Sequence, residues 1–237
     1  MKVRLISYTP DPAGVASRAA RVCVSQDIPD AAYPASLRAA LKSGHESVLE
    51  HVSFTFSAEG ISRACSHQLV RHRIASYSQQ SQRYVKLDNA GFVIPESFKN
   101  WDMVDYYDDD GYGSPVKINV SQLIGKISDA YRDMIEKGIP AEDARYILPN
   151  ATCTNIILTM NARELRHFIK LRTCGRAQWE IRELACKMRA LAIEAAPELF
   201  EDTGPACISD GRCTEARPCG ECVLKVREEM DRLGAKE

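Results

Sequence analysis

The stretch "HVSFTFSAEGISRACSHQLVRHR", residues 51–73, changes its hydrophobic period part-way along. In its first part a valine and two phenylalanines alternate with polar residues, which predicts a strand with one buried face. In its second part Ser62 is a residue type that favours the N-cap of a helix. The stretch therefore predicts a strand followed by a helix that ends near Arg73.

The rest of the chain mixes helical and strand periods, which predicts the α+β class. We expect one domain, residues 1–202, in which a sheet packs against long helices, and a short Cys-rich extension at 203–237. The other expected elements are a helix at 34–44, a polar loop at 74–81, an acidic loop near 101–113, a long amphipathic helix at 120–135 ended by Gly138, a short helix at 139–149, a strand at 152–160, and helices at 161–172 and 177–196.

The composition excludes several classes of protein. A hydrophobic content of 45% is enough for a core, and a net charge of −1 argues against broad nucleic-acid binding. No stretch has the length and purity of a membrane helix, and the first residues lack a signal-peptide core. We therefore expect a soluble, cytoplasmic protein.

Two segments concentrate positive charge. The first, residues 61–85, holds four arginines and no acid, with serines in the loop after the predicted helix. On that helix Gln68, Arg71 and His72 share a face. Such a set suits a ligand with many phosphate oxygens. The alternative is that these arginines pair with the acids of residues 102–110.

The second positive segment, residues 161–176, places arginines on both faces of a predicted helix. Arg163 and His167 share one face, whereas Arg172 lies roughly 180° around from Arg163 at about 100° per residue. One small ligand cannot easily be held by both arginines of an intact helix. Two ligands, or two subunits that each use one face, would resolve this.

Glycine-rich loops for dinucleotides and triphosphates are absent from the sequence, so spacing alone predicts only a site for phosphorylated nucleotides. Longer motifs say more. They are "GHESVLEHVSFTF" at 44–56, "RHRIASYSQQS" at 71–81, "EDARYILP" at 142–149, and "NARELRHFIKLR" followed by "AQWEIR" at 161–182. In content and order these blocks resemble the flavin-dependent thymidylate synthases, the ThyX family.

The resemblance implies a methyltransferase that converts dUMP to dTMP. Members of the family take the carbon from 5,10-methylenetetrahydrofolate and reducing equivalents from NADPH through bound FAD. They form homotetramers whose active sites are shared between subunits. The alternative is an Arg-rich module that binds a nucleotide or RNA without catalysis.

The resemblance also implies roles for single residues. The expected flavin ligands are His45, Ser47, Glu50, Arg71, His72, Arg73, Gln79, Asn161, Arg163 and His167. The expected dUMP ligands are Gln68, Arg71, Gln79, Gln80, Ser81, Gln82, Arg83, Arg145 and Arg172. Arg172 is the expected catalytic residue, because a cation at the uracil ring favours the ring anion. Gln79 stands where the family commonly has Glu.

Four of the nine cysteines lie near the end of the chain, and the last two form a C-x-x-C pair like those of zinc sites. They are Cys207, Cys213, Cys219 and Cys222. This pattern leaves two alternatives open, a zinc site and a set of free or packing thiols. The resemblance requires no cysteine nucleophile.

Overall fold

The computed structural model describes residues 1–27, 32, 34–85, 91–100, 104–106, 116–221 and 223–235. It confirms the α+β class, with a four-stranded sheet and many helices. The chain divides into two compact units. Unit 1 consists of residues 1–59, 65–78 and 155–237, and unit 2 consists of residues 60–64 and 79–154.

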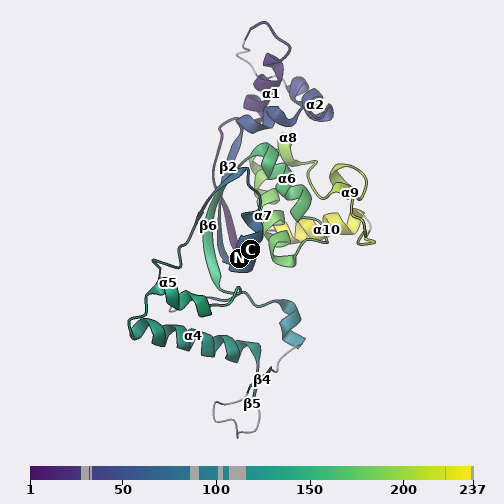
Figure 1. The fold of residues 1–237 in the computed structure, drawn as a ribbon. Coiled ribbons are helices and arrows are strands. Elements are labelled where there is room, and N and C mark those ends of the chain that lie inside the picture. The colour runs from purple at the N-terminus through teal and green to yellow at the C-terminus, as the bar shows by residue number, and fades with distance from the viewer. Residues whose placement is uncertain are drawn as a thin grey trace. The chain divides into compact units, whose positions relative to one another are not determined.

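The four-stranded sheet is shared by segments far apart in the sequence (Figure 1). Its order is β1 (Lys2–Tyr8), β2 (Ser53–Ser62), β6 (Cys153–Asn161) and β3 (Ala75–Gln79). The predicted strand face is confirmed, because Val52, Phe54 and Phe56 are fully buried. Leu158 and Met160 of β6 join them in the core.

Unit 1 surrounds its part of the sheet with helices. They are α1 (Pro12–Val22), α2 (Pro34–Lys42), the 3-10 helix η1 (Glu46–His51), most of α3 (Arg63–Leu69), α6 (Ala162–Arg172), α7 (Trp179–Ala195), α8 (Pro197–Phe200), α9 (Ala206–Ser209) and α10 (Val223–Gly234). Within the described ranges, no helix combines the length and apolarity that crossing a membrane requires.

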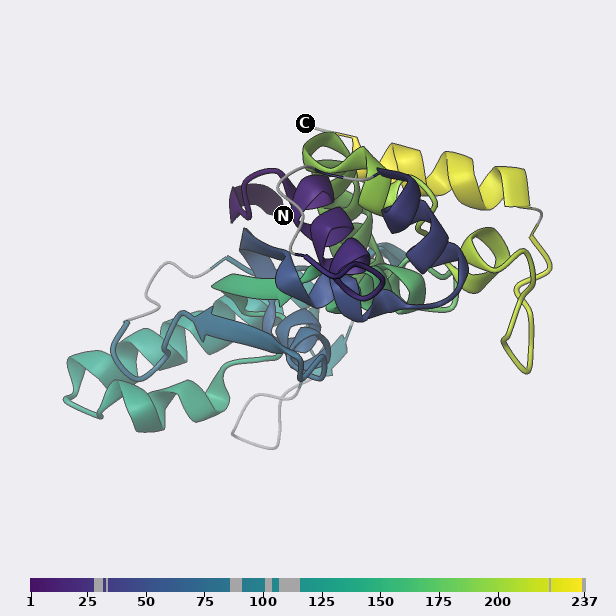
Figure 2. The same ribbon diagram turned by 90° about the horizontal axis from the view of Figure 1, so that it is seen from above.

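The predicted Cys-rich extension includes α10, which lies along α7 (Figure 2). Val226 and Met230, one turn apart on α10, bury against Cys186 of α7. Gly234 permits this close approach, because a Cβ atom there would lie 2.9 Å from the carbonyl oxygen of Cys186. The helical part of the extension is therefore packed into unit 1.

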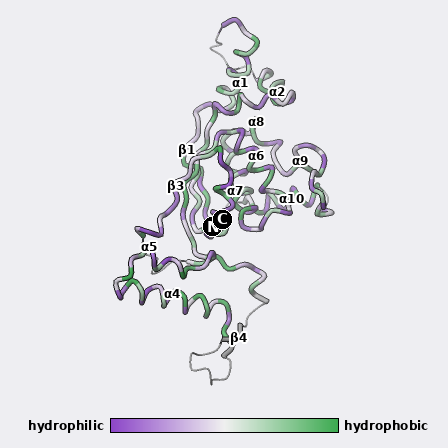
Figure 3. Tube along the Cα trace, in the orientation of Figure 1, coloured by the Kyte–Doolittle hydropathy of each residue, from purple (hydrophilic) through white to green (hydrophobic). Residues whose placement is uncertain are grey.

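Unit 2 is built around the predicted amphipathic helix, α4 (Val120–Glu136). Asn119 caps it and exchanges hydrogen bonds with Gln122, and Gly138 follows its end with a φ of 86°. Hydrophobic and hydrophilic residues alternate along its turns (Figure 3). On the hydrophobic side Tyr131 is buried, while Leu123, Ile124 and Ile127 are only half-buried.

The remaining elements of unit 2 are short. They are η2 (Glu96–Asn100), β4 (Val104–Tyr106), β5 (Val116–Ile118), α5 (Ala141–Ala144) and η3 (Arg145–Ile147), with β4 and β5 antiparallel. Of the acidic loop expected near 101–113, only β4 belongs to the described residues. The short helix predicted at 139–149 is confirmed as α5 and η3.

The end of α3 corrects two predictions. The helix stops at Leu69 instead of near Arg73, so Arg71 and His72 do not share a helical face with Gln68. The hydroxyl of Tyr77 lies 2.9 Å from the carbonyl oxygens of Leu69 and His72, as a donor to both. The bond to Leu69 satisfies the carbonyl of the last residue of the helix. The residues expected as a polar loop instead form β3 and alternate between half-buried and exposed.

Candidate functional site

One face of α6 lines a pocket of about 930 Å³ in unit 1, which we call the Arg163 pocket. The Asn161 side chain accepts from the Glu164 amide at 2.8 Å and so starts the helix. Arg163 follows on the first turn and His167 lies one turn later, and both line the pocket, as the sequence predicts. Residues of α2, η1, the segment between α3 and β3, and the segment after α7 complete the wall. They are Arg38, Leu41, Lys42, Glu46, Glu50, Ile74, Glu198, Asp202, Thr203, Gly204, Ser209 and Asp210, together with Glu164, Arg166 and Lys170 of α6.

Arg163 is held by exposed carboxylates. Its Nη1 donates to Glu50 at 2.5 Å, and its Nε lies 3.9 Å from Glu46. The hydrogen bond with Glu50, more than any other contact, raises the pKa of Arg163. All three side chains are about half exposed, so an anionic ligand could replace these carboxylates at small cost.

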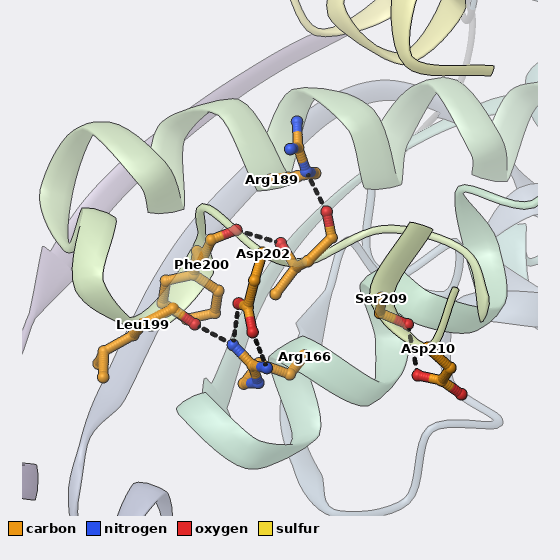
Figure 4. Close-up of polar contacts among 8 residues, drawn as sticks. Arg166, Arg189, Leu199, Phe200, Asp202, Ser209 and Asp210 are labelled. Atoms are coloured by element: carbon orange, nitrogen blue, oxygen red, sulfur yellow. Dashed lines mark hydrogen bonds and ion pairs between the residues drawn. The ribbon is translucent and has the colours of Figure 1, made fainter. Parts of the chain in front are cut away.

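Two further cations of α6, Arg166 and Lys170, line the pocket, and Figure 4 shows the contacts of Arg166. Arg166 donates to both carboxylate oxygens of Asp202, at 2.7 and 3.0 Å, and also to the carbonyl of Leu199. Lys170 donates to Asp210 at 2.5 Å, and this bond lowers the pKa of Asp210. Arg166 thereby joins α6 to α8 and the segment after it.

A second stripe of α6 carries Glu164, which also lines the Arg163 pocket, and then Phe168 and Arg172. The buried ring of His72 contacts all three. His72 Nδ1 lies 3.1 Å from Glu164 Oε1, and Arg172 Nε donates to His72 Nε2 at 3.0 Å. The ring also meets Phe168 edge-on, with 4.9 Å between centroids. Arg172 does not line the Arg163 pocket, so the predicted opposition of the two arginines holds.

Burial decides the charge of His72. Its side chain is only 4% exposed, and loss of solvent lowers its pKa to about 4, with the positive charges of Arg172 and His167 as smaller causes. Burial likewise raises the pKa of Glu164. His72 is therefore neutral at pH 7, and one ring nitrogen must act as an acceptor.

Several expected dUMP ligands gather in unit 2 around Glu142. Arg83 donates to the Glu142 carboxylate at 2.8 Å, and its amide donates to the Ser81 hydroxyl at 3.2 Å. Arg145 donates to the carbonyl of Glu142 at 3.0 Å. Gln79 donates to the hydroxyl of Thr154 at 3.3 Å. Gln80 and Gln82 are half-buried in the same segment.

The other predicted site residues lie outside the Arg163 pocket. His45 and Ser47 are exposed at the start of η1, and Gln68 is half-buried on α3. Arg71 and Arg73 line a second pocket of about 380 Å³ in unit 1. Sequence reasoning missed Arg38 and Lys42 on α2, whose signal was a pair of cations one helical turn apart.

The cysteines of the extension meet a residue that the sequence pattern did not include. Cys207, Cys213 and Cys219 line a pocket of about 230 Å³ together with Cys174. Burial, and then the neighbouring thiols, raises the pKa of Cys207. Among the described residues, no three His, Cys, Asp or Glu side chains form a group that could hold a metal ion. Cys222 lies outside them, and the zinc site stays a prediction.

Comparison with known proteins identifies the family. The family described as thymidylate synthase complementing protein matches residues 4–198. The chain belongs to this family. It is 47% identical to a flavin-dependent thymidylate synthase of Geobacter sulfurreducens, over 94% of this chain and 95% of that protein. Proteins of the same description from Clostridium tetani and Pyrococcus furiosus are 42% and 48% identical, over 94% and 80% of this chain and 94% and 77% of their own lengths.

These matches confirm the resemblance predicted from the motifs, and with it an enzyme. They lend no support to a module that binds a nucleotide or RNA without catalysis.

Proposed function

We propose that this chain is an FAD-dependent thymidylate synthase. It would convert dUMP to dTMP with 5,10-methylenetetrahydrofolate as carbon donor and NADPH as reductant. The similarity to the Geobacter sulfurreducens protein over nearly the full length of both chains carries the proposal. We further propose the cytoplasm as its location, as expected from the sequence.

The Arg163 pocket fits the requirements of a flavin nucleotide. Its volume of about 930 Å³ lies at the upper end of the range for small-molecule sites. Arg163, Arg38 and Lys42 supply the positive charge that a pyrophosphate needs, and His167 and Asn161 add polar groups. FAD, when bound, supplies the redox chemistry, while these residues bind and orient it.

Arg172 is the residue that we assign to substrate activation. Carbon five of uracil becomes a good nucleophile only when electron density enters the ring. A guanidinium at the ring carbonyls stabilises the anion that develops there, and it stays charged without donating its proton. The Nη atoms of Arg172 make no hydrogen bond with any described residue, which leaves them available for such a ligand.

Residues of unit 2 supply groups suited to the phosphate and ribose of a nucleotide. Ser81, Arg83 and Arg145 lie around Glu142, and the two arginines provide forks suited to phosphate. Gln79 and Gln82 supply amides in the same segment. We infer a homotetramer, because α6 uses opposite faces for its two arginines and α4 leaves apolar residues half-exposed.

One assay tests this function. The purified protein should carry flavin absorbance, oxidise NADPH, and form dTMP from dUMP only when methylenetetrahydrofolate is present. Mass spectrometry would identify the nucleotide product. A flavin-free protein that binds RNA with strong salt dependence and forms no dTMP would contradict the proposal and favour the non-catalytic module.

A further inference from the structure

Glu164 has a place in the site that the motif resemblance does not give it. At the third position of α6 it fits a capping box with Asn161, and its amide does bond to the Asn161 side chain. Its carboxylate, however, lies 3.1 Å from His72 Nδ1 and is largely buried. The contact joins residues 92 positions apart in the sequence.

Hydrogen bonding fixes the proton on His72. The Nε of Arg172 is always a donor, so His72 Nε2, 3.0 Å away, must accept. A neutral ring that accepts at Nε2 carries its hydrogen on Nδ1. That hydrogen points at Glu164 Oε1, which must therefore be the acceptor. Arg172 therefore donates to His72, and His72 in turn donates to Glu164.

The surroundings hold this arrangement in one geometry. Phe168, fully buried between Glu164 and Arg172 on the same stripe of α6, packs edge-on against the ring. The Tyr77 hydroxyl donates to the backbone carbonyl of His72 at 2.9 Å. The ring can neither rotate freely nor exchange its partners for water, because its side chain is only 4% exposed.

We infer that Glu164 is a positioning residue for Arg172, acting through His72. By fixing the Nδ1–H tautomer, it keeps Nε2 as an acceptor and so holds the Nε edge of the guanidinium. The Nη edge is then directed toward the ligand. Without the carboxylate, His72 can adopt the Nε2–H tautomer, which places a donor against the donor of Arg172. This inference rests on the proposed role of Arg172 at the uracil ring.

Two substitutions test the inference. Glu164→Gln keeps an acceptor of the same shape, and Glu164→Leu removes it. Because Glu164 also lines the Arg163 pocket, activity is measured at saturating FAD. We then expect Glu164→Leu to lower kcat for dTMP formation roughly 10- to 100-fold, because a small displacement of an activating group is costly. Glu164→Gln, whose side-chain oxygen can still accept from Nδ1–H, should keep kcat within about threefold of the wild type. Glu180→Gln, at the other glutamate buried on a long helix of unit 1, is the matched control.

The tautomer is measured separately from activity. NMR of protein labelled with ¹⁵N-histidine, assigned with His72→Gln, should show a neutral Nδ1–H ring at pH 7. Kinetics and tautomer must change together. A variant that loses the Nδ1–H form but keeps its kcat, or keeps that form and loses kcat, overturns the inference. Because the NMR signal needs no turnover, a wild type that forms no dTMP would count against the proposed function alone.

A double variant separates positioning from general structural damage. If Glu164 acts only through Arg172, then Glu164→Leu should cause no further loss of activity in an Arg172→Ala background. Losses that multiply would show that Glu164 acts independently of Arg172, and the inference would fail.

Discussion

The first and last turns of α6 each carry an arginine, yet the two are held in different ways. Arg163 is half exposed and bonded to Glu50, which is half exposed as well. Arg172 donates to a buried histidine that a buried carboxylate orients in turn. The comparison teaches that one helix can present a cation free to exchange partners and another fixed before any ligand arrives. The first suits the binding of a cofactor, and the second suits the stabilisation of a short-lived charge.

The largest expected effect is at Arg172, the arginine that is held in place at the end of α6. Arg172→Ala should lower dTMP formation by about 100-fold or more, as expected for the loss of one charge-assisted contact to a developing anion. FAD content should survive, since Arg163 and His167 lie on the other face. Arg172→Lys should recover little, because an ammonium does not reproduce the planar fork. Near-normal turnover of the alanine variant at saturating dUMP would place activation elsewhere.

The stability of the protein should also depend on pH, through the buried His72 that holds Arg172. Burial lowers the pKa of His72 to about 4, so between pH 6.5 and 4 the unfolded chain binds more protons than the folded one. The stability contributed by neutral His72 is complete above pH 6.5 and falls as the pH drops, by about 3 kcal/mol at most. The raised pKa of Glu164 acts in the opposite sense, and Arg172 and His167 also face the ring.

Urea unfolding of the FAD-loaded protein at pH 7 and pH 4.5 would measure this. The wild type should lose more stability on acidification than His72→Gln, which has no imidazole to protonate. Equal losses in the two proteins would show that His72 does not carry the dependence.

Local patterns predicted much of this architecture, and non-local contacts explain what they missed. The strand face at Phe54 and Phe56 and the opposition of Arg163 and Arg172 follow from periods of two and 3.6 residues. The end of α3 does not, because the Tyr77 hydroxyl that bonds to its last carbonyl belongs to a later strand.

Glu164 shows the same limit within the site. Its position three residues after Asn161 is typical of a helix cap, and its amide does donate to the Asn161 side chain, but its carboxylate contacts a histidine from another part of the fold. The zinc prediction at the end of the chain had a similar weakness. Spacing selected cysteines close in sequence, whereas the pocket adds Cys174 from the end of α6.

At the start of α6, where Arg163 can exchange its partners, Arg163→Ala should weaken FAD binding by about tenfold. This is the effect expected from the loss of one hydrogen bond to a charged group. Folding stability should hardly change, because exposed ion pairs contribute little. Flavin fluorescence titration and thermal unfolding would measure the two. Arg132→Ala, which removes an exposed arginine paired with Asp129 on α4, is the matched control and should change neither. A large loss of stability in Arg163→Ala would mean that this end is as fixed as the other.

The smallest expected effect concerns Cys174, the thiol closest in sequence to Arg172. If a cysteine performed the activation, the fixed arginine would not be needed, and the contrast between the two ends of α6 would lose its functional meaning. Cys174 lines the pocket of the extension and is absent from the wall of the Arg163 pocket. Cys174→Ser should therefore keep turnover within about twofold and stability within about 0.5 kcal/mol, as for a substitution away from the chemistry. Cys153→Ser in unit 2, whose thiol lies 3.9 Å from the Gly60 carbonyl, is the matched control. Both variants would be assayed for dTMP formation and FAD content in the same preparations as Arg172→Ala. Complete loss of activity in a folded, FAD-loaded Cys174→Ser protein would assign the activating role to the thiol.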